Sequence, residues 1–232
     1  MMAMPFVLSP EGQLKLVIFD CDGVLVDSEA TCCGISAEEA RAAGMTVPAG
    51  KEVETFSGMA LPGIQKLIEE KTGKSLGATW AAQTQARFVE AMQNGVEPID
   101  GVHDMLENVV KLGLPVRVGS NSSCQEMAIK FKTTNLEHFF ENRIHSARDM
   151  GFPKPRPDVY LHAAQEEGVK PENCVVLEDS NTGAKAAVNA GMACVLLRAQ
   201  GEPVPDWPNL VVIHHLSEFA PLLKKALKTQ EQ

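Results

Sequence analysis

Short, almost uninterrupted apolar segments recur along the chain. The clearest covers residues 14–20 and ends in carboxylates, and the weakest covers residues 143–146. The others cover residues 115–119, 174–177, 193–197 and 210–213. Segments of this kind are typical of strands that are buried on both faces of a parallel sheet.

Segments with helical spacing separate these predicted strands. They cover residues 103–112, 125–133, 158–167 and 183–190. Strands that alternate with helices of this length indicate right-handed βαβ units. The sequence therefore predicts an α/β fold whose core is a doubly wound, Rossmann-like parallel sheet.

Residues 27–98 depart from this alternation, because helical patterns follow one another there with no convincing strand between them. The expected helices cover residues 36–43, 61–71 and 79–93. We therefore expect residues 1–26 and 99–232 to form the core domain, and residues 27–98 to form an inserted, all-helical cap domain.

The composition fits a globular protein that does not bind polyanions. Hydrophobic residues make up 44% of the 232 residues, and 30 Asp and Glu against 21 Lys and Arg give a net charge of −9. This charge argues against nucleic acid or an anionic membrane as a partner, and no apolar segment approaches the ~20 residues of a membrane span. A small anionic ligand stays possible, because a bound metal ion can reverse the local charge.

The six cysteines do not suggest a disulfide framework, because the chain has no C-x-x-C pair and its size requires no staple. Residues 1–8 lack the positive charge and cleavage site of a secretory signal. We therefore expect a reduced, cytoplasmic protein. We also expect a monomer, because no exposed apolar stripe is evident.

The first predicted strand ends in the carboxylates of Asp20 and Asp22. Residues two apart on an extended chain point the same way, so both can face one site. Ligands of open α/β sheets bind beyond the carboxyl ends of the strands. Two neighbouring carboxylates repel each other, and a divalent cation allows both to stay charged. Taken alone, the same residues could instead form an Asp-rich turn or helix cap.

Three later segments are just as ambiguous one by one. Ser120 and Asn121 could bind phosphate at a helix N-terminus or simply cap that helix. Lys154 lies in a loop stiffened by three prolines and could point inward, or it could be a solvated surface charge. Glu178 and Asp179 follow a buried strand and are hard oxygen ligands suited to Mg²⁺.

Taken in order, the four segments resemble the haloacid dehalogenase superfamily of phosphohydrolases. The matching segments are DCDGVLVDS (20–28), SNS (120–122), KPRPD (154–158) and LEDSNTG (177–183). The helical insert lies where that superfamily has its first type of cap. Within the superfamily the sequence is most similar to the phosphoglucomutase-like branch, which contains many sugar-phosphate phosphatases.

The resemblance implies roles for the matching residues. Asp20 would be the nucleophile that forms an aspartyl-phosphate, and Asp22 would be the general acid and base. Ser120, Lys154 and the backbone N–H of Asn121 would hold the phosphoryl group.

The resemblance also implies a Mg²⁺ site. The ion would be held by Asp20, the carbonyl of Asp22 and Asp179. Glu178 would contact the ion directly or support one of its ligands.

The insert bears on the substrate. Gly58 and Met59 resemble part of the specificity loop of this branch, and Arg87 could supply a cation, although an exposed helix position is the alternative. Mutases of the branch carry an arginine near the position of Leu61 and a histidine shortly after the first motif, and this chain has neither.

We therefore predict a Mg²⁺-dependent phosphatase that acts on a small phosphorylated metabolite, either a phosphosugar or a sugar-acid phosphate. The alternatives are a sugar phosphomutase and a non-catalytic protein that binds phospho-ligands on the same fold.

Overall fold

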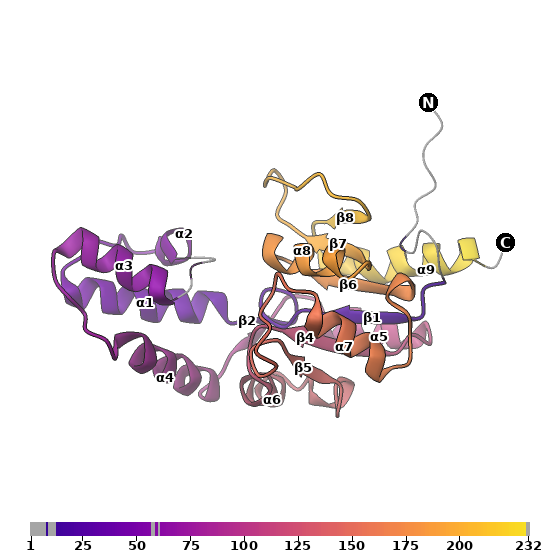
Figure 1. The fold of residues 1–232 in the computed structure, drawn as a ribbon, viewed down its shortest axis with the longest axis horizontal. Helices are drawn as coiled ribbons and strands as arrows, with labels where there is room; N and C mark the ends of the chain where they lie inside the picture. Colours follow the sequence, from indigo (N-terminus) through magenta and orange to yellow (C-terminus); the bar gives the residue numbers. More distant parts are fainter. Residues whose placement is uncertain (1–7, 9–12, 57–58, 60, 231–232) are drawn as a thin grey trace. The chain divides into compact units, whose positions relative to one another are not determined.

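The computed structural model describes residues 8, 13–56, 59 and 61–230. The chain divides into two compact units (Figure 1). The core unit combines Met1–Val26 with Pro98–Gln232, and the helical unit is Asp27–Glu97. Within the described ranges, no helix is long and apolar enough to cross a membrane.

A six-stranded parallel sheet forms the centre of the core unit, with the strand order β5-β4-β1-β6-β7-β8. Its strands are β1 (Leu16–Phe19), β4 (Val116–Ser120), β5 (Ile144–Ser146), β6 (Cys174–Glu178), β7 (Ala193–Leu197) and β8 (Leu210–Ile213). Because β1 lies between β4 and β6 and the strands are parallel, the carboxyl ends of these three strands lie side by side at the same end of the sheet. This end of the sheet is called the sheet edge below. The predicted α/β fold class is confirmed.

Helices cover both faces of the sheet. On one face, α7 (Asp158–Glu166) and α8 (Asn181–Asn189) pack against a core that includes Leu16 and Ile18 of β1. On the other face, the ring of Phe19 lies 5.9 Å from that of Phe219, the first residue of α9 (Phe219–Gln230).

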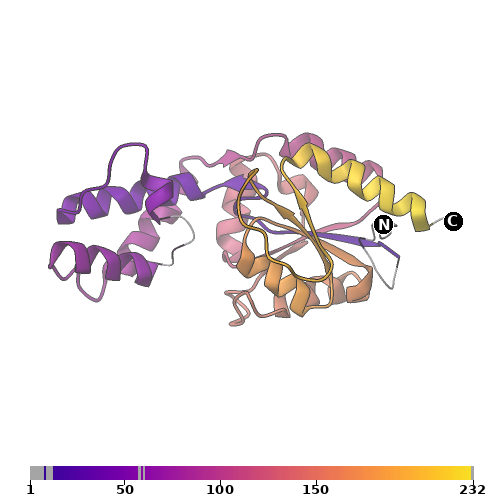
Figure 2. The ribbon, with the colours of Figure 1, turned by 90° about the horizontal axis from the view of Figure 1, so that it is seen from above.

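Two further helices belong to this second face. The helix α5 (Val102–Lys111) packs against α9 (Figure 2). The helix α6 (Cys124–Thr133) joins them through Phe131, whose ring contacts that of Phe140 beside Phe19. Successive side chains of β1 therefore pack against helices on opposite faces of the sheet. This is why the sequence of the strand is apolar at every position.

The helical unit contains α1 (Glu29–Ala43), α2 (Glu52–Phe56), α3 (Leu61–Thr72) and α4 (Trp80–Gln93). Its core gathers Phe56, Ile64, Ile68 and Trp80 against a row of small residues on α1. The helix α1 begins at Glu29, not at residue 36, because its buried face continues through Cys33. Small residues on that face give little contrast with the polar side, which hid the first two turns from the sequence pattern.

The two links between the units lie side by side. The chain passes into the helical unit along β2 (Val26–Asp27) and returns along β3 (Glu97–Pro98), and these short strands pair in a sheet of their own. The insertion therefore begins and ends at neighbouring points.

A buried polar cluster joins β4 and β5. The Nε of Arg117 donates a hydrogen bond to Glu167 (2.7 Å), and its Nη1 lies 3.0 Å from Nε2 of His145. A guanidinium only donates, so this nitrogen of His145 must accept and the imidazole is neutral. Burial and the adjacent guanidinium lower the pKa of His145 to about 4.

This cluster predicts a pH-dependent stability. An unfolded histidine binds a proton below about pH 6.5, whereas folded His145 stays neutral down to about pH 4. The free energy of unfolding should therefore fall as the pH drops through this window. His145→Gln should remove up to about 1.4 kcal/mol per pH unit of that slope in urea unfolding curves. The exposed His138→Gln is the control, and an unchanged slope in His145→Gln would contradict the expectation.

Candidate active site

The carboxyl ends of three adjacent strands bring the predicted acidic and hydroxyl residues together. Asp20 follows β1, Ser120 ends β4 and Glu178 ends β6. Phe19 lies opposite Leu177 in the parallel register, and the N–H of Asp20 donates to the carbonyl of Leu177 (2.9 Å). The backbone hydrogen bonds of the sheet therefore fix Asp20 beside Glu178.

Lys154 reaches this sheet edge from the loop between β5 and α7. Its Nζ donates to Oδ1 of Asp20 (2.8 Å) and to Oε1 of Glu178 (2.7 Å). Its backbone N–H donates to the side-chain oxygen of Asn121 (2.9 Å), which holds the loop against the segment that follows β4. With 7% of its surface exposed, Lys154 is a buried cation and not a solvated one.

Burial and charge act against each other here. Burial and, after it, the nearby carboxylate of Glu178 raise the pKa of Asp20 to about 7, although the ammonium of Lys154 opposes both effects. The pKa of Lys154 is raised, because attraction to Asp20 and Glu178 outweighs the effect of its burial. The same ammonium, against the effect of burial, holds the pKa of Glu178 below its usual value. One buried cation is therefore shared by two carboxylates.

Glu178 is fully enclosed by hydrogen-bond donors. Its Oε1 accepts from Lys154 and from the hydroxyl of Tyr160 (2.8 Å). Its Oε2 accepts from the N–H groups of Asp179 and Ser180 (both 3.1 Å) and from Oγ of Ser180 (3.0 Å). A carboxylate with this many donors has a stable charge and a fixed orientation.

The space around Glu178 requires a glycine at position 183. A Cβ atom at Gly183 would lie 1.5 Å from Oε1 of Glu178. Ser180 caps α8 by accepting a hydrogen bond from the N–H of Gly183 (3.0 Å), so the first turn of the helix lies directly over the carboxylate. Even an alanine there would displace Glu178.

An oxygen cluster at the same edge could hold a cation. Asp20, Glu178 and Asp179 each offer an oxygen, and these atoms lie within 4.8 Å of one another. Carboxylate oxygens are the ligands that Mg²⁺ prefers in proteins. A Cβ atom at Gly23 would lie 1.9 Å from Oδ2 of Asp179, so the absence of a side chain at Gly23 leaves room for that carboxylate. The donor set and the space both fit Mg²⁺.

Asp22 lies beside a group that sequence reasoning did not assign to the site. Its Oδ1 accepts from Nζ of Lys130 (2.6 Å), and its Oδ2 accepts from Oγ of Ser122 (2.7 Å). Lys130 is almost completely buried in α6, with 1% of its side chain exposed. Asp22 keeps 33% of its side chain exposed. Its carboxylate is therefore held on one side and open to solvent on the other.

Three site residues were missed, and each left a weak signal. Lys130 follows Met127 by three residues and precedes Phe131, so it occupies the buried face of α6, where a charge is unusual. Ser122 is part of the SNS motif but was given no role. Tyr160 is the single tyrosine of the chain and lies in the first turn of the helix after the Lys154 loop.

The remaining predicted residues belong to the helical unit. Gly58 lies outside the described residues. Met59 lines a pocket of about 90 Å³ within the helical unit, together with Phe56 and Phe88 among others. Arg87 forms ion pairs with Glu38 (2.7 Å) and Glu39, so its positive charge is already balanced within the helical unit.

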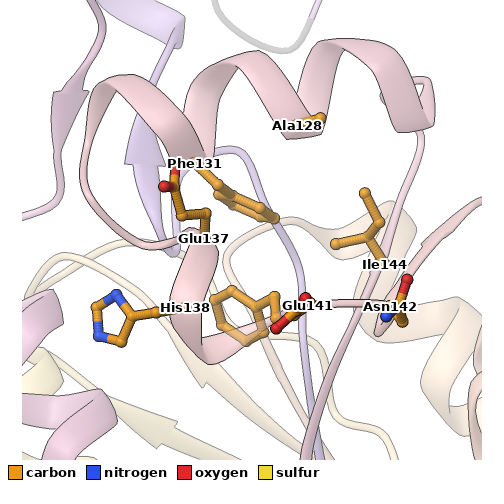
Figure 3. A pocket seen from close by; sticks show the side chains of 8 residues that line it. Ala128, Phe131, Glu137, His138, Glu141, Asn142 and Ile144 are labelled. Atoms are coloured by element: carbon orange, nitrogen blue, oxygen red, sulfur yellow. The ribbon is translucent and has the colours of Figure 1, made fainter.

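A separate pocket of about 480 Å³ lies at the amino end of β5 (Figure 3). Phe131 and Ile144 line it, and Glu137 and Glu141 add carboxylates. Asp20 and its partners lie at the carboxyl ends of the strands, where ligands of such sheets bind. This pocket lies at the amino end of β5 and is therefore not part of that site.

Comparisons with known proteins place the chain among hydrolases. The family described as haloacid dehalogenase-like hydrolase matches residues 17–197. The chain is 29% identical to 6-phosphogluconate phosphatase of Escherichia coli, over 92% of this chain and 96% of that protein. It is 30% identical to fructose-1-phosphate phosphatase of the same organism, over 78% of this chain and 95% of that protein.

A solved structure is similar over nearly the whole chain. It is a hydrolase of the same family from Deinococcus radiodurans with bound phosphate and sodium, 29% identical in sequence, with a TM-score of 0.76. The similarity covers 92% of this chain and 97% of that one.

The contact between Gly23 and Asp179 predicts a metal-binding defect. Gly23→Ala should weaken Mg²⁺ binding at least about tenfold in isothermal titration calorimetry, because the methyl group would displace the carboxylate of Asp179. Gly113→Ala is the matched control, since Gly113 has a similar φ (+76° against +78°) and nothing within 4 Å of its Cβ position. Equal affinity in the two variants would exclude Asp179 as a ligand.

Proposed function

Because the chain belongs to the haloacid dehalogenase-like hydrolases and is a phosphomonoester hydrolase among them, we propose that it is a Mg²⁺-dependent phosphatase for small sugar phosphates. The observation that carries the proposal is the Nζ of Lys154 between Asp20 and Glu178, next to Asp179. This arrangement presents a nucleophilic carboxylate, a cation and metal ligands at one sheet edge.

The reaction would take place in two steps. A carboxylate oxygen of Asp20 attacks phosphorus, the bond to the leaving oxygen breaks, and Asp22 gives that oxygen a proton. A water molecule then attacks phosphorus in the aspartyl-phosphate, loses its proton to Asp22 and frees Asp20 as inorganic phosphate forms. Each step moves one proton through Asp22, so both protonation states of this carboxyl are used in one cycle.

Positive charge and hydrogen-bond donors would hold the phosphoryl group. Lys154 supplies the charge, and the hydroxyl of Ser120 and the N–H of Asn121 supply donors beside it. The Oγ of Ser120 accepts from the N–H of Ser122 (3.1 Å), and its own hydrogen would donate to the phosphoryl group. These groups would bind the phosphoryl oxygens as charge develops on them.

Asp20, Asp179 and the carbonyl of Asp22 would hold Mg²⁺. Because both oxygens of Glu178 already accept hydrogen bonds, Glu178 would chiefly support Lys154 and the segment carrying Asp179. The ion supplies neutralising charge, without which a carboxylate and a phosphate repel each other.

Two relatives point to the substrate class, because one is named for 6-phosphogluconate and the other for fructose 1-phosphate. We propose that the helical unit acts as the cap and selects among such compounds through the segment of sequence that contains Gly58 and Met59. The pairing of Arg87 with two glutamates argues against a grip on a second phosphate, as a mutase would need. The six free cysteines fit a reducing compartment such as the cytoplasm.

Replacing the nucleophile should abolish turnover. Asp20→Asn should lower phosphate release at least about 10³-fold, because an amide cannot form the acyl phosphate. Circular dichroism should show an unchanged fold. The exposed Asp104→Asn on α5 is the control and should stay active. Substantial phosphatase activity in Asp20→Asn would disprove the mechanism.

Metal removal and product analysis test the rest of the proposal. EDTA should stop phosphate release from a panel of sugar phosphates, and added Mg²⁺ should restore it. A hexose 1-phosphate that serves as substrate should yield inorganic phosphate. Conversion to hexose 6-phosphate would instead identify a mutase, and no reaction with any phosphomonoester would favour a binding protein.

A further inference from the structure

Lys130 is a buried cation that the proposed chemistry leaves without a role. Its side chain is 1% exposed, although lysine is rarely fully buried unless it is paired. Its Nζ donates to Oδ1 of Asp22 (2.6 Å) and to Oγ of Ser122 (3.0 Å). The ammonium therefore donates one hydrogen bond to the carboxylate of Asp22 and a second to the hydroxyl of Ser122.

The side chains of Lys130, Asp22 and Ser122 form hydrogen bonds with one another within the core unit. Lys130 engages one oxygen of Asp22, and Ser122 engages the other through its Oγ (2.7 Å). A carboxylate oxygen can accept more than one hydrogen bond, and Asp22 remains one-third exposed. The carboxylate is thus tethered on its buried side while its open side can still exchange a proton.

The hydrogen bonds from Lys130 and Ser122 to Asp22, called the tether below, depend on the capped N-terminus of α6. Ser123 caps α6 in a capping box with Glu126, with hydrogen bonds of 3.2 Å and 2.7 Å. Ser122 immediately precedes this cap, and Lys130 lies two turns into the helix. The position of α6 therefore sets where both donors meet Asp22.

We propose that Lys130 is a positioning residue that holds the carboxylate of Asp22 where it exchanges its proton with the leaving oxygen and with water. This inference rests on the proposed phosphatase function. The backbone around Asp22 is fixed, since the N–H of Gly23 donates to the carbonyl of Val26 (2.9 Å), but its side chain has two free torsions. Without the tether the carboxylate would spread over several rotamers, and few of them would be productive.

The choice of leaving group separates this role from a merely structural one. An alkoxide leaving from a sugar phosphate requires a proton, whereas nitrophenolate leaves as a stable anion. Both substrates require the same nucleophile, metal ion and phosphate-binding groups. A defect in placing Asp22 should therefore reduce kcat/KM, which reports the first chemical step, mainly for the alkyl substrate.

The test compares Lys130→Met with wild type on glucose 6-phosphate or another accepted sugar phosphate, and on p-nitrophenyl phosphate. We expect kcat/KM to fall about 100-fold for the sugar phosphate and less than about threefold for the aryl phosphate. Lys132→Met, an exposed position on the same helix, should change neither. In an Asp22→Asn background, Lys130→Met should have little further effect, because the two residues act as one unit.

Several outcomes would overturn the inference. An equal loss on both substrates would make Lys130 a structural residue, and no loss on either would leave it without a role. If Lys130→Met does not fold, Ser122→Ala removes the other tether and should show the same split between substrates; equal rates on both would refute the proposal. Failure of the wild-type protein to hydrolyse any phosphomonoester would instead disprove the proposed function, so the two failures are distinguishable.

Discussion

One buried ammonium group determines whether the acidic site can form. The Nζ of Lys154 lies 2.8 Å from Asp20 and 2.7 Å from Glu178, and neither carboxylate could stay charged at this depth without a partner. Since the lysine belongs to the loop before α7 and the acids follow β1 and β6, the interaction joins segments far apart in the sequence. Removing one partner of a buried ion pair typically costs ~3–5 kcal/mol, so stability and chemistry depend on the same contact.

The carboxylates described at this end of the sheet outnumber the described ammonium groups, which bears on how an acidic protein could bind the anionic substrate proposed above. The carboxylates described there are those of Asp20, Asp22, Glu178 and Asp179, and the described ammonium groups are those of Lys154 and Lys130. A phosphate would meet net repulsion there until a divalent cation is bound. The overall charge of −9 therefore does not exclude phosphate, and it agrees with the Mg²⁺ dependence proposed above.

The fold class could be predicted from the sequence because it depends on local patterns, whereas the candidate site residues came from motifs that resemble a known superfamily. The strand β1 is apolar on both faces, Asp20 directly follows it, and Glu178 is the last residue of β6. The rule for parallel sheets therefore placed both residues at the carboxyl ends of the strands, and the pairing of β1 with β6 brings them together. The resemblance to haloacid dehalogenase-like hydrolases is confirmed over residues 17–197. The role of Lys130 could not be found in this way, because its place on the buried face of α6 marks the charge as unusual but does not show which group it contacts. The contact between Lys130 and Asp22, which are 108 positions apart, is seen only in the three-dimensional structure, where the strand order places β1 next to β4 and the helix α6 that follows it.

The pairing of β2 with β3 has a consequence for how this protein can diversify. Because the insertion begins and ends at adjacent points, residues 27–97 can be lengthened, shortened or exchanged without pulling the sheet apart. All hydrogen bonds described around Asp20, Asp22 and Glu178 come from the core unit, so such an exchange leaves them in place. Under the proposed role of the helical unit as the cap, recombination at these two neighbouring links would change the substrate preference and keep the arrangement around Asp20.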